Sequence, residues 1–186
     1  MFRFTGVTEF EYTSECIVFD LVSIGLYHGW LVDPQMEDTA IAIGNMSYNQ
    51  VVEFIISGRT STDPLDQSKS LLAEQFLEES ASQLTYHGIC ELNSVMKEGQ
   101  VAVFFRNNHF SSMCKHQGVM YLLVTDQGFL EQADVVWETL DSVQGDTVFV
   151  DQQFNIVQQS QGQCDDVICH IVQITTHFRW SGWCIR

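Results

Sequence analysis

The chain has 186 residues, which is enough for one domain with a sizeable hydrophobic core. Hydrophobic residues make up 45% of it and charged residues 17%, a composition typical of a globular protein and not of a disordered one. Lys and Arg number 8 against 24 Asp and Glu, which gives a net charge of -16. A surface that acidic repels phosphate groups, so nucleic acid and anionic membranes are disfavoured as partners.

Membrane, secretion and disulfide signals are also missing from the sequence. No apolar run is long enough to span a bilayer, and the N-terminus lacks a signal-peptide pattern. Scattered cysteines without a CxxC pair favour reduced thiols in an intracellular protein. They are Cys16, Cys90, Cys114, Cys164, Cys169 and Cys184. Because the cysteine and histidine spacings between Cys164 and His177 match no zinc pattern, we expect neither a metal site nor a cofactor.

The chain opens with alternating aromatic residues. Met1 to Thr13 therefore predicts a strand that needs a partner strand. Ser14 can cap a helix from Glu15 to about Ser23, and Gly25 ends it. Leu26 to Gln35 carries three rings close together and predicts a loop or a short extended segment.

Three further stretches have apolar residues at helical spacing. These helices are expected from Asn45 or Ser47 to Gly58, from about Ser68 to Gln83, and from Thr85 to about Lys97. Between the first two, the polar run Arg59–Gln67 predicts a loop. The last two helices are better candidates for scaffold than for site.

The second half of the chain has the two-residue period of strands. Strands are expected at Val101–Arg106, from the Asn107–Asn108 turn to Met113, at Gly118–Thr125 and at Thr147–Val150, with Val135–Leu140 a segment of either type. Helices followed by a meander of strands predict an α+β fold with an antiparallel sheet.

His109 follows the Asn–Asn turn, where one strand gives way to the next. A histidine at such a place is well held and can still reach a cleft. An unperturbed imidazole titrates near pH ~6.5, so it can take and return a proton at neutral pH. The alternative is a hydrogen-bonded packing histidine beside aromatic residues, and the residues alone leave both interpretations open.

A nucleophile to accompany this base is harder to find. Cys16 and Cys90 lie in amphipathic helix patterns. Cys114 lies five places from His109 along a strand, where it rarely faces the base. Since free cysteine is among the most buried residue types and a buried thiol is inert, each of the three is expected to be a packing residue.

Several long words occur in order along the chain. They are LYHGWLVDPQ (Leu26 to Gln35), SYNQVVE (Ser47 to Glu53), AEQFLE (Ala73 to Glu78), QLTYHGICEL (Gln83 to Leu92), VFFRNNHFSSM (Val103 to Met113), YLLVTDQGF (Tyr121 to Phe129) and VVWETL (Val135 to Leu140). Together they closely resemble the MINDY family, intracellular cysteine-type deubiquitinases that are distantly papain-like. The resemblance runs from about Phe2 to Val150.

The resemblance implies a role for specific residues. His109 matches the general base that draws the proton from the cysteine thiol. The aromatic residues that match a ubiquitin-facing surface are Trp30, Tyr48 and Phe105. Following the papain-like order, with a polar residue on the strand after the histidine, Asp126 or Gln127 is the candidate to orient His109. The expected partner is polyubiquitin, preferably lysine-48-linked, trimmed from its distal end.

One departure from the family pattern affects the function. In the family the nucleophilic cysteine, with a glutamine just upstream, lies well before the FTG word, and this chain begins just before FRFTG. The resemblance therefore implies a partial deubiquitinase domain over residues 1–150, incomplete at its N-terminus. A divergent, poorly ordered tail is expected over residues 151–186.

We accordingly expect the C-terminal part of a deubiquitinase domain, inactive by itself, with a cytoplasmic and also a nuclear location. A second hypothesis is a ubiquitin-binding module without catalysis. A third is an incomplete chain that does not fold stably and exposes large apolar patches.

Overall fold

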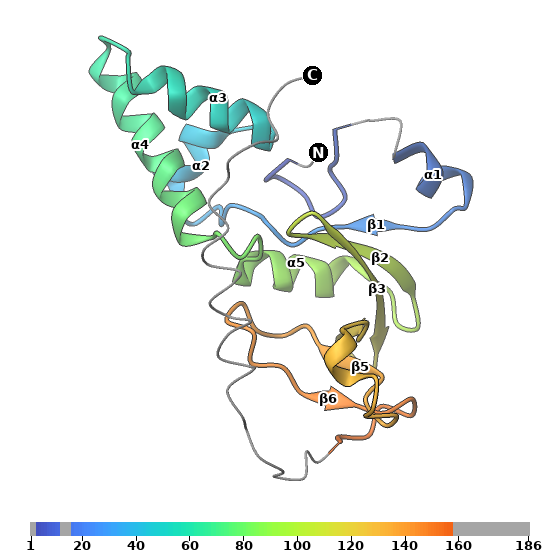
Figure 1. The fold of residues 1–186 in the computed structure, drawn as a ribbon. Helices are drawn as coiled ribbons and strands as arrows, with labels where there is room; N and C mark the ends of the chain where they lie inside the picture. The colour runs from blue at the N-terminus through green and yellow to red at the C-terminus, as the bar shows by residue number, and fades with distance from the viewer. Residues whose placement is uncertain (1–2, 12–15, 158–186) are drawn as a thin grey trace. The chain divides into compact units, whose positions relative to one another are not determined.

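The computed structural model describes residues 3–11 and 16–157, which form the predicted α+β fold (Figure 1). The helices among them are α1 (Cys16–Leu21), α2 (Glu37–Ile43), α3 (Tyr48–Gly58), α4 (Pro64–Glu79) and α5 (Tyr86–Val95). The strands are β1 (Leu26–Tyr27), β2 (Val101–Arg106), β3 (His109–His116), β4 (Val119–Leu123), β5 (Trp137–Thr139) and β6 (Phe149–Val150), with a 3-10 helix, η1 (Gln127–Phe129), before β5. From residue 158 on, the predicted tail lies outside the described residues. The cysteines and histidines whose spacing was compared with zinc sites, Cys164 to His177, lie there too.

The strands form one sheet in the order β1-β2-β3-β4-β5-β6. From β2 onward each strand pairs antiparallel with the next, which confirms the predicted meander. β1 pairs parallel with β2, with Leu26 opposite Val103. The sequence pattern did not identify this parallel pair because two residues are too few to show a period.

The β2–β3 hairpin turns at Asn107 and Asn108, as predicted. Both residues have left-handed backbones, with φ of 50° and 59°. Such a two-residue turn matches the right-handed twist of the paired strands, and asparagine tolerates this conformation better than most residues. The turn makes Arg106 and His109 the last cross-strand pair of the hairpin.

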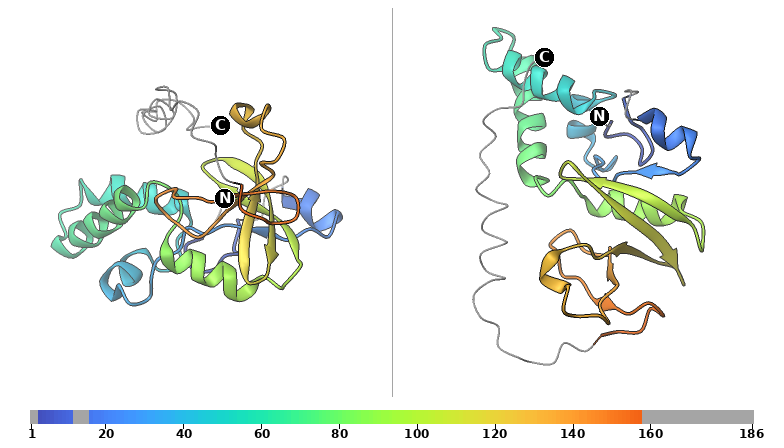
Figure 2. Two further views of the ribbon diagram at one scale, coloured as in Figure 1. Left: turned by 90° about the horizontal axis from the view of Figure 1, so that it is seen from below. Right: turned by 45° about the vertical axis from the view of Figure 1, so that its right-hand side comes forward.

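One face of the sheet packs against α5, which lies across it (Figure 2). The buried cluster between them draws on both layers and includes Leu84, Leu92, Met96, Ala102, Phe104, Met113 and Leu122. Ala102 and Phe104 alternate with more exposed residues along β2, as expected for a strand with one buried face.

A second cluster forms where α2, α3 and α4 pack together beside the sheet (Figure 2). Its buried members are Phe4, Trp30, Val32, Ile43, Val51, Ile55, Ala73 and Phe76. Within the described parts of the chain, no helix has the length and apolar character needed to cross a membrane.

The predicted strand at the N-terminus is wrong for residues 3–11. The chain folds back on itself there, because the Arg3 amide donates to the Glu9 carbonyl at 2.8 Å and the Glu9 amide to that of Gly6 at 3.1 Å. Arg3 forms only an isolated bridge, to Ser47. The alternating rings serve packing instead, since Phe4 is 1% exposed.

Two helix boundaries also differ from the prediction. α4 starts at Pro64 and not near Ser68, because the Asp63 carboxylate accepts a hydrogen bond from the Leu65 amide at 2.9 Å and caps the helix. The predicted loop Arg59–Gln67 is therefore too long. α4 also ends at Glu79. α2 was not predicted, because its 7 residues make only about two turns and show little period.

Gly88 allows α5 to approach the segment that follows β1. A Cβ at Gly88 would lie 1.8 Å from the Gly29 carbonyl oxygen, which is backbone and cannot move aside. The Thr85 amide, at the start of the same helix, donates to that carbonyl at 3.0 Å. The absence of a side chain at Gly88 therefore sets the distance between α5 and the segment.

We predict that Gly88→Ala lowers the free energy of unfolding by at least about 2 kcal/mol, because the overlap forces backbone to shift. Denaturant unfolding measures this. Gly6→Ala is the control, since its Cβ would meet only the Glu9 side chain, at 3.1 Å. Equal losses in the two variants would contradict the close approach as the cause.

Candidate functional site

His109 is the first residue of β3, at the tip of the β2–β3 hairpin. Its side chain is exposed. A buried packing histidine is therefore not what the structure contains at this position. An exposed imidazole at the end of a paired strand has the access that a proton carrier needs.

Arg106, the cross-strand partner of His109, anchors the hairpin to the loop between α4 and α5. Its Nε donates to the Ser82 carbonyl at 2.7 Å. Burial lowers the pKa of the guanidinium, and the charge of Glu138 opposes that shift. Burial likewise raises the pKa of Glu138, against the attraction of Arg106. Each of the two charges thus favours the ionised form of the other.

Asp126 and Gln127, the candidates to orient His109, lie at the start of η1. The Asp126 carboxylate accepts a hydrogen bond from the Gly128 amide at 2.6 Å and caps that helix. The β3–β4 register pairs Met113 with Leu122, and its continuation would bring Asp126 level with His109. The paired part of β4 ends before that point, so the orienting role stays a prediction.

Trp30, Tyr48 and Phe105, predicted to face ubiquitin, lie in one cluster. Trp30 is only 3% exposed, and its Nε1 donates to the Ser80 hydroxyl at 2.6 Å. The Trp30 and Tyr48 ring centroids are 5.6 Å apart. Tyr48 and Phe105 are half-buried, and burial raises the pKa of the Tyr48 phenol. Trp30 is thus buried inside the cluster, while Tyr48 and Phe105 reach the surface of the protein.

Sequence reasoning missed three rings that extend this surface towards α1. Phe105 lies 4.9 Å from Phe110, between ring centroids, and 6.3 Å from Phe10. Phe110, the residue after His109, lies 5.4 Å from Phe19. Phe10 belongs to the alternating N-terminal aromatics, but no sequence period relates it to Phe105, since the two meet only in the fold.

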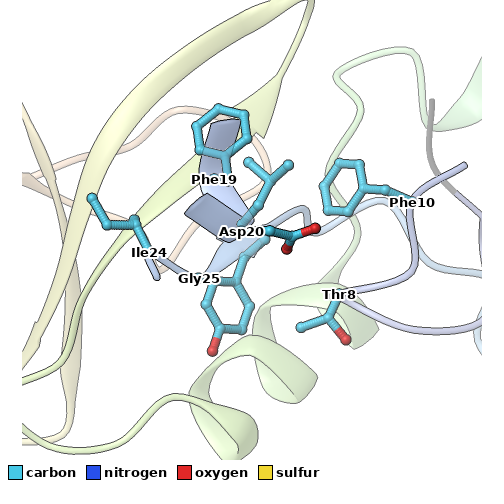
Figure 3. Close-up of a pocket in the computed structure, with 8 residues that line it drawn as sticks. Thr8, Phe10, Phe19, Asp20, Ile24 and Gly25 are labelled. Atoms are coloured by element: carbon cyan, nitrogen blue, oxygen red, sulfur yellow. The ribbon is translucent and has the colours of Figure 1, made fainter. Parts of the chain in front are cut away.

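A pocket of about 310 Å³ lies beside these rings (Figure 3). Its lining residues are Thr8, Phe10, Phe19, Asp20, Ile24, Gly25, Leu26 and Tyr27. Phe10 and Phe19 flank the space, and Asp20, the one charged lining residue, lies between them (Figure 3). The hairpin tip therefore stands beside a hollow that both aromatic rings and polar groups line.

The Cys114 thiol does not accompany His109. Cys114 lies five positions along β3, roughly 17 Å away at strand spacing and on the opposite face of the sheet. It packs with Tyr121 and Val150, and burial raises the pKa of its thiol. Cys90 is exposed on α5. Residues 3–11 and 16–157 hold no cluster of side chains that could bind a metal ion.

Comparison with known proteins identifies a family. The model of the family described as MINDY deubiquitinase matches residues 2–154. Ubiquitin carboxyl-terminal hydrolase MINDY-1 of Danio rerio is 61% identical over 159 residues, which are 86% of this chain and 31% of that protein. Human MINDY-1 is 59% identical, over 83% of this chain and 33% of its own. Human MINDY-2 is 60% identical, over 83% of this chain and 25% of its own length. The chain thus spans a third or less of these relatives.

His28 is buried against Phe10, one of the rings beside the hairpin tip, and its burial couples folding to pH. It is 1% exposed, and the Phe10 ring lies edge-on to it with centroids 5.1 Å apart. Burial lowers its pKa from 6.5 to about 4, although the backbones of Glu9 and Gly6 act in the opposite direction. The unfolded chain therefore binds a proton on His28 that the folded chain excludes, at any pH between those two values.

We predict that this contribution to stability is present above pH 6.5 and is lost as the pH falls towards 4. The loss is about 2 kcal/mol between pH 7 and about pH 5. Urea unfolding of the chain and of His28→Gln at both pH values measures it. The variant should lose less stability on acidification, and an equal loss would assign the effect to other groups.

Proposed function

Because the chain belongs to the MINDY deubiquitinase family, we propose that it carries the general base and the ubiquitin-binding surface of a cysteine-type deubiquitinase. The observation that supports this most is His109, an exposed histidine at the tip of a hairpin beside an aromatic surface. The substrate class is ubiquitin joined through isopeptide bonds, with lysine-48-linked polyubiquitin preferred.

In the proposed mechanism His109 removes the proton from a cysteine thiol. The thiolate attacks the isopeptide carbonyl, and the tetrahedral intermediate collapses to an acyl-enzyme as the lysine amine leaves with the proton from His109. Water then hydrolyses the thioester, with His109 as the base, and the thiol is regenerated. Cys114 is a poor nucleophile for this step because it is buried on the opposite face.

We propose that the nucleophile comes from outside the described residues, as the family pattern implies. A thiol that reaches the hairpin tip would find His109 exposed beside the pocket lined by Phe10 and Phe19. Under this proposal the chain supplies the base and the binding surface, and turnover requires the segment that bears the cysteine.

The alternative is a ubiquitin-binding module without catalysis. The position of Cys114 favours it, since this thiol lies too far along β3 from His109 to be activated by it and form an acyl-enzyme. Tyr48 and Phe105 would still offer ubiquitin an aromatic contact. The two functions differ in the role of His109, which a deubiquitinase needs for turnover and a binding module does not need.

Cleavage of lysine-48-linked polyubiquitin by the chain, with His109→Ala alongside, tests whether the chain is catalytic by itself. Cleavage that His109→Ala abolishes supports a deubiquitinase and places a nucleophile within these 186 residues. Binding of polyubiquitin by a folded chain without cleavage supports the module, or a base that awaits its thiol. The absence of both would refute the proposed function.

Replacement of the surface rings should separate binding from proton transfer. We predict that Tyr48→Ala and Phe105→Ala each weaken polyubiquitin binding about tenfold, because each removes an aromatic contact, whereas His109→Ala leaves it nearly intact. Trp30→Ala should weaken binding and also cost about 3 kcal/mol of stability or more, since Trp30 is 3% exposed. Titration calorimetry and thermal unfolding measure these effects.

Equal loss of binding in His109→Ala and Tyr48→Ala, with both variants folded, would contradict this division of roles. Ile56→Ala is a matched surface control, since Ile56 is 62% exposed on α3 and outside the aromatic cluster. Its binding should equal that of the unchanged chain.

A further inference from the structure

The loop between α4 and α5, residues 80–84, holds the hairpin that carries His109. The Asn107 amide, at the first turn position, donates to Gln83 Oε1 at 2.9 Å. In a two-residue hairpin this amide has no partner within the turn, so it normally bonds to water. Here the side chain of Gln83, which lies 24 residues earlier in the chain, takes the place of that water.

A second hydrogen bond joins the same two elements. Arg106 Nε donates to the Ser82 carbonyl at 2.7 Å, on the strand residue that pairs directly with His109. The charge of Glu138, on β5, also favours the charged form of Arg106 and acts against the effect of burial on its pKa. Arg106 and Asn107 flank the first peptide bond of the turn. They are therefore held by hydrogen bonds to Ser82 and Gln83, respectively.

The loop is itself firmly held, which it must be if it is to position anything. The Gln83 amide donates to the Ser80 carbonyl at 2.8 Å, and Gln83 has a left-handed backbone, with φ of 54°. The Ser80 hydroxyl accepts from Trp30 Nε1 at 2.6 Å and donates to the Phe76 carbonyl at 2.5 Å. Leu84, at the other end, is 1% exposed. Both ends of the loop are thus anchored in the two cores.

We infer that Gln83 is a positioning residue for His109: it fixes the hairpin turn so that the imidazole keeps one orientation. The inference rests on the proposed role of His109 as a general base. A base that samples several orientations spends less time in the reactive one, so a small loss of order lowers the rate and not the affinity. Gln83 acts through the turn and does not itself contact substrate in this account.

The test compares two substitutions that differ in one property. Gln83→Glu keeps an acceptor oxygen for the Asn107 amide, whereas Gln83→Met has similar length and no acceptor oxygen. Gln75→Met is the matched control, because Gln75 is exposed on α4 and bonds to Glu79 within the same helix. Each variant of the 186-residue chain is first checked for an unchanged thermal midpoint.

Nuclear magnetic resonance gives the direct measurement. In Gln83→Met the Asn107 amide should exchange with solvent about tenfold faster, and three-bond couplings should show His109 spread over more χ1 rotamers. Gln83→Glu and Gln75→Met should match the unchanged chain. Unchanged His109 rotamers in a folded Gln83→Met would overturn the inference, as would a Glu variant that behaves like the Met variant.

The enzymatic measurement is the split between kcat and KM for polyubiquitin cleavage. Gln83→Met should lower kcat about tenfold and leave KM unchanged, with Gln83→Glu restoring kcat. A change in KM alone would overturn the inference. If the chain binds polyubiquitin without cleaving it, the base lacks its thiol, and the His109 rotamers alone decide whether Gln83 positions the residue.

Arg106→Lys provides a second variant if Gln83→Met does not fold. Lysine keeps the positive charge near Glu138 but has no Nε–H in the place that meets the Ser82 carbonyl. It should broaden the His109 rotamers in the same way. An ordered His109 in this variant would show that the Arg106–Ser82 hydrogen bond does not contribute to fixing the hairpin.

Discussion

The contact between the start of α5 and the extended segment 28–32 is the constraint on which both cores depend. Thr85 fixes it with two hydrogen bonds: its amide donates to the Gly29 carbonyl at 3.0 Å and its hydroxyl to the Leu31 carbonyl at 2.9 Å. The same hydroxyl accepts from the Gly88 amide at 3.0 Å and caps the helix. Because the segment is extended, Trp30 enters the helical core and Leu31 enters the core under the sheet.

Much of the sheet was predictable because its determinants are local. Alternation over Val101–Arg106 and two asparagines were enough to predict the hairpin and the place of His109 at its tip. The parallel pairing of β1 was not predictable in this way, since it depends on a partner seventy-seven residues further on, at Val103. Turns also override alternation, and residues 3–11 show this with aromatic side chains that pack into a core from a folded loop.

The candidate site likewise divides into features that the sequence predicts and features that depend on contacts between distant segments. Family resemblance assigned His109, Trp30, Tyr48 and Phe105, and the fold brings the three aromatic residues into one cluster. It did not indicate that Trp30 is a buried support and not an exposed contact, because burial depends on helices that come later in the chain. Phe10, Phe19 and Gln83 act through contacts between distant segments, and no spacing in the sequence relates them to His109.

The alternation of segment 28–32 also limits how the lengths of related chains can vary. A single inserted or deleted residue there would exchange the two sides, sending the Trp30 position towards the sheet and the Leu31 position towards the helices. The surface loop at residues 59–63 carries no such restriction, because its side chains are largely exposed and it only connects α3 to α4. Length variation among relatives should therefore collect between those two helices and avoid the segment.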